Sequence, residues 1–119
     1  MRVLQINHLY RAFGGGERYL FDLCSGLEEK GVEVAVLSSR DRENYAYGKG
    51  RREFFIDRSF GLRTGFKSRH GVEKIVNDFN PHLIHFHETL TFLSPLIMRR
   101  LVHMKPSVQT LHTAFFFAL

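Results

Sequence analysis

Two short apolar segments near the N-terminus have the composition of buried strands. Residues 3–6 and 32–37 are rich in Val, Leu and Ile, and the second reads VEVAVL, which is apolar on both faces for most of its length. Between them, apolar side chains recur at helical spacing, at Leu20, Leu23, Cys24 and Leu27. Gly31 follows, where a left-handed residue commonly ends a helix. The pattern predicts a strand, a helix that begins at Glu17, and a second strand parallel to the first.

The second half of the chain repeats this alternation. Apolar side chains recur at helical spacing at Val72, Ile75, Val76 and Phe79. Asn80-Pro81 ends that helix, because the residue before a proline disfavours the helical conformation, and residues 82–87 (HLIHFH) form the next predicted strand. Ser94-Pro95 then predicts a further helix with Ser94 as its N-cap. The buried side of this helix is expected to hold Leu93, Leu96, Ile97 and Leu101.

The remaining segments complete an alternating order of strands and helices. Residues 52–57 (REFFID) predict a strand, and a loop with Gly61 and Gly65 is expected after it. A last strand is predicted at residues 107–112. Strands that alternate with helices form a parallel sheet covered on both faces. The predicted fold is therefore α/β, a Rossmann-like doubly wound parallel sheet, in a single domain over residues 1–119 without internal repeats or a low-complexity linker.

Composition narrows the class of protein. Apolar residues make up 44% of the 119 residues and charged residues 24%, which is ordinary for a soluble globular protein. No apolar run approaches the ~20 residues of a membrane-spanning helix, and the N-terminus lacks the layout of a signal peptide. We therefore expect a cytoplasmic protein. The one cysteine, Cys24, lies on the apolar face of a predicted helix and is interpreted as a small buried thiol rather than a nucleophile.

The net charge of +5 is concentrated in one stretch of the chain. Residues 40–70 hold nine Lys or Arg against four Asp or Glu, whereas the rest of the chain balances at eight against eight. A basic stretch of this kind is suited to phosphates, anionic lipid headgroups or nucleic acid. The alternative interpretation is a solvated loop in a moderately basic protein.

Three of the predicted strands end at polar residues. The three strand ends are Asn7-His8, His87-Glu88 and His112-Thr113. In doubly wound sheets, ligands bind outside the carboxyl ends of the strands, at the point where the strand order reverses. We therefore expect a binding site at this edge, beside the first and fourth strands.

Three glycines, Gly14, Gly15 and Gly16, stand between the first strand and the first helix. Unobstructed backbone N–H groups at a helix N-terminus favour an anion such as a diphosphate. The alternative is a tight turn that requires positive φ. A Walker A loop is excluded because no Gly-Lys-Ser/Thr follows, and the dinucleotide fingerprint fails because the third glycine is missing. Ser38-Ser39 at the end of the second strand also replace the acidic residue that would bind a ribose.

The same edge holds residues that suggest two further kinds of site. His85 and His87 share one face of a strand, and His112 is expected to end a neighbouring strand, which makes a zinc site conceivable. Without cysteine ligands or an HExxH spacing, a histidine that bonds the backbone or a polar substrate explains the pattern as well, and no metal is predicted. A hydrolase triad is not predicted, because the chain has no GxSxG motif to supply its nucleophile. Glu88 is either part of the site or an exposed acid that opens a loop.

In order and spacing the chain resembles the N-terminal domain of family 4 glycosyltransferases, which are retaining enzymes with the two-domain GT-B fold. The resemblance is carried by the segments MRVLQINHLYRAFGGGERYLFDLCSGLEEKGVEVAVLSS, FNPHLIHFHETLTFLSPLIMRR and SVQTLHT. Within them, the shared motifs are a glycine loop followed by Glu-Arg, an H-x-H-E strand end and a T-L-H-T strand end.

The resemblance implies a division of roles among these motifs. Gly14, Gly15 and Gly16 would approach the diphosphate of a nucleotide-sugar donor. His112, with Thr113 beside it, would orient the transferred sugar and stabilise charge. His87 and Glu88 would line the side of the cleft that receives an acceptor glycan or lipid. Neither a metal nor another cofactor is implied, and nucleic acid is not expected as a partner. A basic surface in such enzymes also implies peripheral membrane contact, here through residues 40–70.

The family's second domain, which binds most of the donor nucleotide, has no counterpart in these 119 residues. We therefore expect a truncated product, a fragment, or one half of an enzyme completed by a C-terminal half in trans, and expect the isolated chain to be inactive. The competing hypothesis is a non-catalytic Rossmann-like module that uses the basic stretch to bind nucleic acid or a partner protein.

Overall fold

The protein forms one parallel sheet with helices on both faces. A computed structural model describes residues 1–8, 10, 15–40, 50–57, 62–89 and 92–110, with the backbone alone at 15–17 and 62–68. Five strands pair in the order β3-β2-β1-β4-β5, and every pair is parallel. The strands are β1 (Arg2–Ile6), β2 (Glu33–Ser39), β3 (Arg52–Ile56), β4 (Leu83–Phe86) and β5 (Ser107–Gln109).

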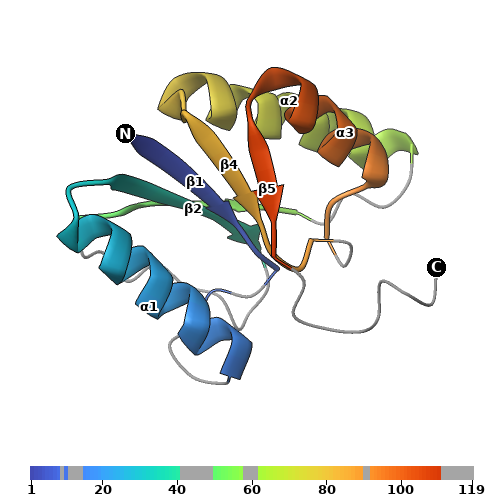
Figure 1. The fold of residues 1–119 in the computed structure, drawn as a ribbon. Coiled ribbons are helices and arrows are strands. Elements are labelled where there is room, and N and C mark those ends of the chain that lie inside the picture. The colour runs from blue at the N-terminus through green and yellow to red at the C-terminus, as the bar shows by residue number, and fades with distance from the viewer. Residues whose placement is uncertain (9, 11–14, 41–49, 58–61, 90–91, 111–119) are drawn as a thin grey trace.

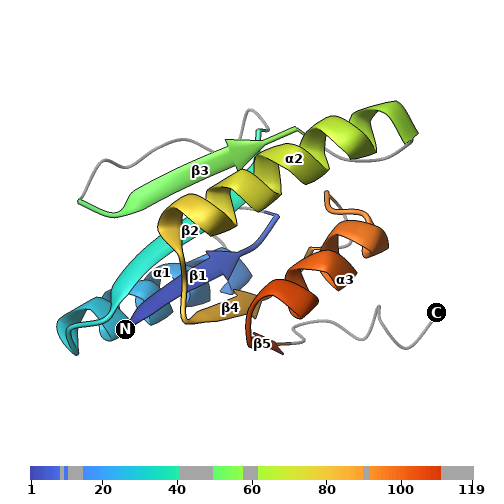
Figure 2. The same cartoon turned by 90° about the horizontal axis from the view of Figure 1, so that it is seen from above.

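Three helices connect the strands. Helix α1 (Gly15–Glu29) covers one face of the sheet, and α2 (Leu62–Phe79) and α3 (Pro95–Met104) cover the other (Figures 1 and 2). The first crossover therefore passes on the opposite side of the sheet from the later ones. This arrangement confirms the prediction of a doubly wound α/β sheet with its order reversal between β1 and β4.

The alternation of side chains along the strands divides the core into two layers. On the α2 and α3 side, residues such as Leu4, Leu37 and Ile84 form the larger apolar cluster. On the α1 side, the smaller cluster comprises Tyr10, Leu20, Cys24, Val34 and Val36. Both faces of the central strands are thus buried, which explains why their sequences are nearly continuous in apolar residues.

The helix ends follow the signals in the sequence. Gly31 adopts φ +83° just after α1, and Asn80 adopts φ +51° before Pro81, where α2 ends. The Ser94 side chain caps α3 by accepting a hydrogen bond of 3.3 Å from the backbone N–H of Ile97. These three predicted helix ends are confirmed.

Some local expectations were wrong. Helix α2 begins at Leu62, so Gly65 lies inside a helix and not in a loop; a glycine inside a helix costs only about 1 kcal/mol, which tertiary packing readily overrides. Helix α1 begins at Gly15, two residues before the predicted start at Glu17. Leu96 is 75% exposed, because Ile97 and Leu101, four positions apart, turn the other side of α3 toward the sheet. The structure ends β5 at Gln109 rather than continuing it to residue 112, and residues 111–112 lie outside the described residues.

Within the described part of the chain, no helix combines the length and the apolar character that crossing a membrane requires.

Candidate functional site

Backbone hydrogen bonds bring the carboxyl ends of β1 and β4 together. The His87 N–H donates to the Ile6 carbonyl at 2.9 Å, and the His8 N–H donates to the Glu88 carbonyl at 2.9 Å. The Asn7 side chain adds a bond, since its Oδ1 accepts from the Glu88 N–H at 3.0 Å. Asn7-His8 and His87-Glu88 therefore lie side by side at the reversal of strand order, as the sequence predicted. This is the position where doubly wound sheets bind ligands.

The His87 side chain is held inside the protein. It is 2% exposed, and its Nε2 lies 2.6 Å from Oε1 of Gln5, which is itself fully buried. Because an amide oxygen only accepts, the His87 Nε2 carries the proton in this pair. The ring of Tyr19 in α1 meets the His87 ring edge-on at a centroid distance of 6.1 Å. The ring of His87 is thus oriented by β1 on one side and by α1 on the other.

His85 extends this polar group toward β5. Its ring centroid lies 4.0 Å from that of His87, and its Nε2 lies 2.7 Å from Oγ1 of Thr110. The row Thr110, His85, His87 and Gln5 crosses three neighbouring strands on the face that α1 covers. Such a row of polar side chains is costly to bury unless its members are paired, so it marks a part of the sheet where packing alone does not explain the residue choice.

Glu88 is fixed through its backbone and is partly exposed at the edge. Its N–H and its carbonyl are both engaged with β1, at Asn7 and His8. The residue therefore stands where the side chain meets solvent beside the buried His87. Its role toward an acceptor stays a prediction.

The glycine segment reaches the same edge. Gly15 and Gly16 are the first two residues of α1, and Figure 1 shows the N-terminus of this helix on the side where β1 ends. The first N–H groups of a helix have no partner within the helix and carry its positive dipole end. At these two positions the backbone is helical. Gly14 lies outside the described residues, and the interpretation as a diphosphate site stays a prediction.

The third predicted strand end is described only up to Thr110. The N–H of Thr110 donates to the Phe86 carbonyl at 2.9 Å, and Nε2 of Gln109 donates to the His87 carbonyl at 3.3 Å. These bonds place Gln109 and Thr110 beside the strand end that carries His87. His112 and Thr113 lie outside the described residues, so their predicted catalytic roles stay untested.

Two features of the α1 face escaped the sequence analysis. Gln5 was not recognised as part of the site, although a polar residue in the middle of an apolar strand was a signal that could have drawn attention to it. Arg51 was counted only within the basic stretch, yet its side chain is buried and forms an ion pair with Glu28. Nothing in the sequence marks Glu28 as the partner of a residue that lies 23 positions further along the chain.

The geometry also bears on the Cys24 thiol and on metal binding. Cys24 is fully buried, as predicted, and burial raises the pKa of its thiol to about 12, so that the group is neutral at ordinary pH. Among the described residues, no three His, Cys, Asp or Glu side chains come together in a way that would hold a metal ion.

Comparisons with known proteins show the family to which the chain belongs. The model of Glycosyltransferase Family 4 matches residues 13–118. No curated protein sequence matches the chain. Among solved structures, sucrose-phosphate synthase from Thermosynechococcus elongatus is similar, with a TM-score of 0.62 at 16% sequence identity, over 94% of this chain and 33% of that chain.

The two positive matches contribute different information. At 16% identity the structural likeness shows the fold, and it confirms the Rossmann-like sheet that the resemblance implied. The chain spans only a third of the length of that protein. The family model covers nearly all of this chain, from residue 13 to residue 118. The protein belongs to Glycosyltransferase Family 4.

Proposed function

We propose that the chain is the N-terminal part of a retaining glycosyltransferase that moves a sugar from a nucleotide-sugar donor to an acceptor glycan or lipid. One observation carries the proposal. The ends of β1 and β4 meet at the point where the strand order reverses, and α1 begins on the same side of the molecule (Figure 1). A site with backbone N–H donors and polar side chains suits a diphosphate and sugar hydroxyl groups.

The predicted residues have separate roles in this proposal. The N–H groups of the segment Gly14–Gly16 face the donor diphosphate, whose negative charge the helix dipole favours. His112 and Thr113 orient the sugar. Glu88 lines the acceptor side, and the buried His87 supports that strand end through Gln5.

Retention follows from attack on the face of the sugar that the leaving group occupies. The acceptor oxygen forms a bond to the anomeric carbon, the bond from that carbon to the diphosphate oxygen breaks, and the acceptor proton passes to the leaving phosphate. The protein's contribution is to position the reactants and to stabilise the developing charge, with no covalent sugar intermediate.

We also propose that residues 1–119 alone do not complete the reaction. The family match and the length of sucrose-phosphate synthase relative to this chain support this view. The remaining donor contacts would come from a second domain, supplied in the same polypeptide or by a C-terminal half in trans.

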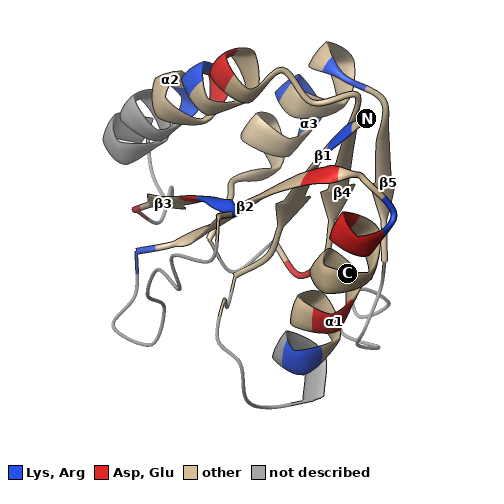
Figure 3. Ribbon diagram, turned by 90° about the vertical axis from the view of Figure 1, so that its left-hand side faces the viewer, with Lys and Arg blue, Asp and Glu red and all other residues tan. Residues whose placement is uncertain are grey.

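Membrane contact through residues 40–70 stays a prediction. Of the arginines described in this stretch, Arg51 is buried in its ion pair with Glu28, and Arg40 donates to the Phe55 carbonyl at 3.0 Å. Arg52 lies over the ring of Phe54 at 5.5 Å from its centroid. Figure 3 shows further basic residues on α2 and α3. Flotation with anionic and with zwitterionic vesicles would test the contact, and equal binding to both would contradict it.

Sugar transfer by the complete enzyme, in which residues 1–119 are joined to a second domain, tests the proposed function. A panel of nucleotide sugars is offered with candidate acceptors, and NMR of the product reports the anomeric configuration. His112→Ala should lower turnover by about 100-fold or more, because an interaction with the transferred sugar acts mainly in the transition state, while the melting temperature stays within about 2 °C of wild type. The exposed His103→Ala, on α3, is the matched control. Unchanged turnover in His112→Ala, or an inverted product, would contradict the assignment.

A further inference from the structure

An exposed tyrosine on α1 stands beside the candidate site. Tyr19 is 42% exposed, and its ring meets the buried ring of His87 edge-on at a centroid distance of 6.1 Å. One part of the Tyr19 ring therefore lies against the end of β4, while another part meets solvent. Single exposed apolar side chains are common on protein surfaces, so the position of this ring says more than its exposure does.

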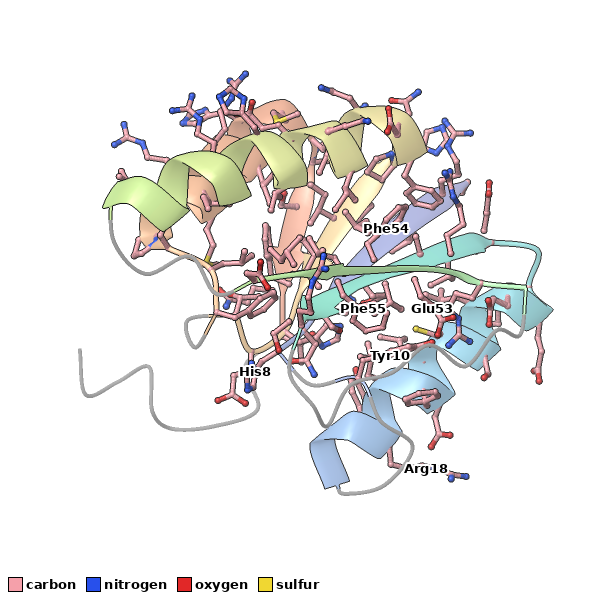
Figure 4. The ribbon with its side chains drawn as sticks, turned by 180° about the vertical axis from the view of Figure 1, so that it is seen from behind. His8, Tyr10, Arg18, Glu53, Phe54 and Phe55 are labelled. Atoms are coloured by element: carbon pink, nitrogen blue, oxygen red, sulfur yellow. The ribbon has the colours of Figure 1, made fainter. Side chains whose placement is uncertain are left out.

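The helix turns Tyr19 toward the strand end. Successive residues of an α-helix are rotated by about 100° around its axis. Arg18 extends away from the sheet (Figure 4), with its Nε 3.4 Å from the Asp22 carboxylate, whereas Leu20 packs into the smaller core cluster. Tyr19 lies between these two directions, at the margin where α1 meets the end of β4.

The residue that Tyr19 contacts is held in a fixed orientation. Nε2 of His87 donates to Oε1 of Gln5 at 2.6 Å, and the ring of His85 lies at a centroid distance of 4.0 Å from the ring of His87. These neighbours leave the His87 ring little freedom, so Tyr19 rests on a rigid base. A tyrosine also has few rotatable bonds, and it therefore loses little entropy when a ligand packs against it.

Packing within the chain does not require an aromatic residue at this position. Tyrosine is a poorer helix former than alanine, leucine or glutamate, and a leucine would also cover the edge of His87. Beneath this ring, Nε2 of the fully buried Gln5 has no hydrogen-bond partner in the described part of the chain. Unpaired buried donors are rare where stability alone decides the choice of residues.

The surroundings of Tyr19 favour a sugar ring as the ligand. A pyranose carries C–H groups on one face and hydroxyl groups around its rim, so it needs one apolar surface and several polar partners. Tyr19 offers the exposed aromatic surface. The residue after His87 is the partly exposed Glu88, and a carboxylate accepts hydrogen bonds from hydroxyl groups but repels an anionic ligand. A single aromatic ring is too small an apolar surface for a lipid chain.

We propose that Tyr19 is an acceptor-binding residue: its ring packs against a sugar ring of the acceptor, next to Glu88, and so favours a neutral glycan over a lipid phosphate. The inference rests on the function proposed above, and it narrows the acceptor from a glycan or lipid to a glycan. Tyr19 takes no part in making or breaking bonds. It holds the acceptor ring beside the strand end that carries His87.

Kinetics of the complete enzyme, in which residues 1–119 are joined to a second domain, test the proposal. Methyl glucoside, methyl mannoside and methyl galactoside are offered as acceptors with UDP-glucose and GDP-mannose as donors, and polyprenyl phosphate is offered as an acceptor without a sugar ring. Tyr19→Phe keeps the aromatic ring, whereas Tyr19→Leu keeps only an apolar side chain. Leu96→Ala is the matched control, because it shortens an exposed apolar side chain on α3, on the opposite face of the sheet.

Tyr19→Leu should raise the KM for the glycoside about tenfold and leave kcat within about twofold, because a contact remote from the reacting atoms binds ground state and transition state alike. Tyr19→Phe and the control should match wild type within about twofold in both constants. Release of nucleoside diphosphate in the absence of an acceptor reports the donor side of the site, and its rate should be the same in wild type and in all variants.

A KM for the glycoside that is unchanged in Tyr19→Leu would overturn the acceptor role, and a lowered melting temperature beside it would assign Tyr19 to packing alone. Transfer to polyprenyl phosphate but to none of the glycosides would also overturn the inference, in favour of a lipid acceptor. Absence of transfer by wild type from every donor would instead overturn the proposed function, and this inference with it.

Discussion

The side chains of His87 and Gln5 are joined by a hydrogen bond of 2.6 Å between Nε2 and Oε1, although the two residues stand 82 positions apart in the chain. Gln5 belongs to β1, and His87 follows β4 directly. The bond therefore connects the two strands between which the strand order reverses. It sets the orientation of the His87 ring beneath the edge where the ligand is proposed to bind.

Gln5→Met should destabilise the protein by about 1–3 kcal/mol, because it leaves the buried N–H of His87 without its acceptor. Urea denaturation at neutral pH, followed by circular dichroism, measures the change. Asn77→Met is the control, since Asn77 is exposed on α2; its effect should stay within about 0.5 kcal/mol. Equal effects of the two substitutions would show that the bond to His87 contributes nothing specific.

Two glycines should respond to alanine with opposite signs. Gly31 adopts φ +83°, so Gly31→Ala forces a side chain into the left-handed region and should cost about 1 kcal/mol. Gly26 lies inside α1 with open space around the new methyl group, so Gly26→Ala should stabilise by about 0.5–1 kcal/mol. Thermal unfolding of the two variants beside wild type measures both. A loss of stability in Gly26→Ala would contradict the helix boundaries described above.

The thiol of Cys24 should be unreactive in the folded protein. It is fully buried, and burial raises its pKa to about 12, so both access and thiolate formation are suppressed. Ellman's reagent at pH 8 should label the native protein at least about 100 times more slowly than the protein in 6 M guanidinium chloride. Rapid labelling under native conditions would mean that the α1 layer opens readily.

Glu73 should contribute stability that depends on pH. Its carboxylate accepts from Arg100 at 2.9 Å and from Arg69 at 3.2 Å, and these bonds, led by that to Arg100, lower its pKa in the folded state. Because the pKa of Glu73 is lower in the folded than in the unfolded protein, its ionised carboxylate stabilises the fold at pH values above the unfolded-state pKa. This stabilisation is lost as the pH falls through the folded-state pKa. Glu73→Gln should cost about 0.5–1 kcal/mol at pH 7.

A pH series of urea unfolding curves measures this contribution. The difference between wild type and Glu73→Gln should shrink as the pH falls below the ordinary glutamate value of 4.5. Glu33→Gln, at the exposed start of β2, serves as the reference substitution. A difference that stays constant from pH 7 to pH 3 would rule out the two arginines as its source.

The order of strands and helices was largely predictable, because the apolar period of a segment depends on the segment itself. The strand at residues 32–37 and the end of α2 at Phe79 were recovered within two residues, whereas the start of α2 was not. The meeting of Asn7-His8 with His87-Glu88 was predictable as well, since the carboxyl ends of parallel strands share one edge of a sheet.

Other features depended on how the elements pack. Leu96 fits the apolar period of α3 but is exposed, because the rotation of the helix over the sheet selects which of its apolar residues are buried. Gly65 lies inside α2, although glycine by itself favours a loop. A period along the chain specifies an amphipathic surface, but not the angle at which that surface is applied to its neighbour.

By itself the sequence determined the α/β class, the crossover order and the edge where a site would form, because these follow from local periodicity and from the geometry of parallel strands. Only the tertiary structure decided that Arg51 forms an ion pair with Glu28 and a hydrogen bond with Tyr10, and that Gln5 forms a hydrogen bond with His87. A buried polar group needs a partner, but the choice of partner depends on distances across the sheet, and these are set when α1, β1 and β4 pack together.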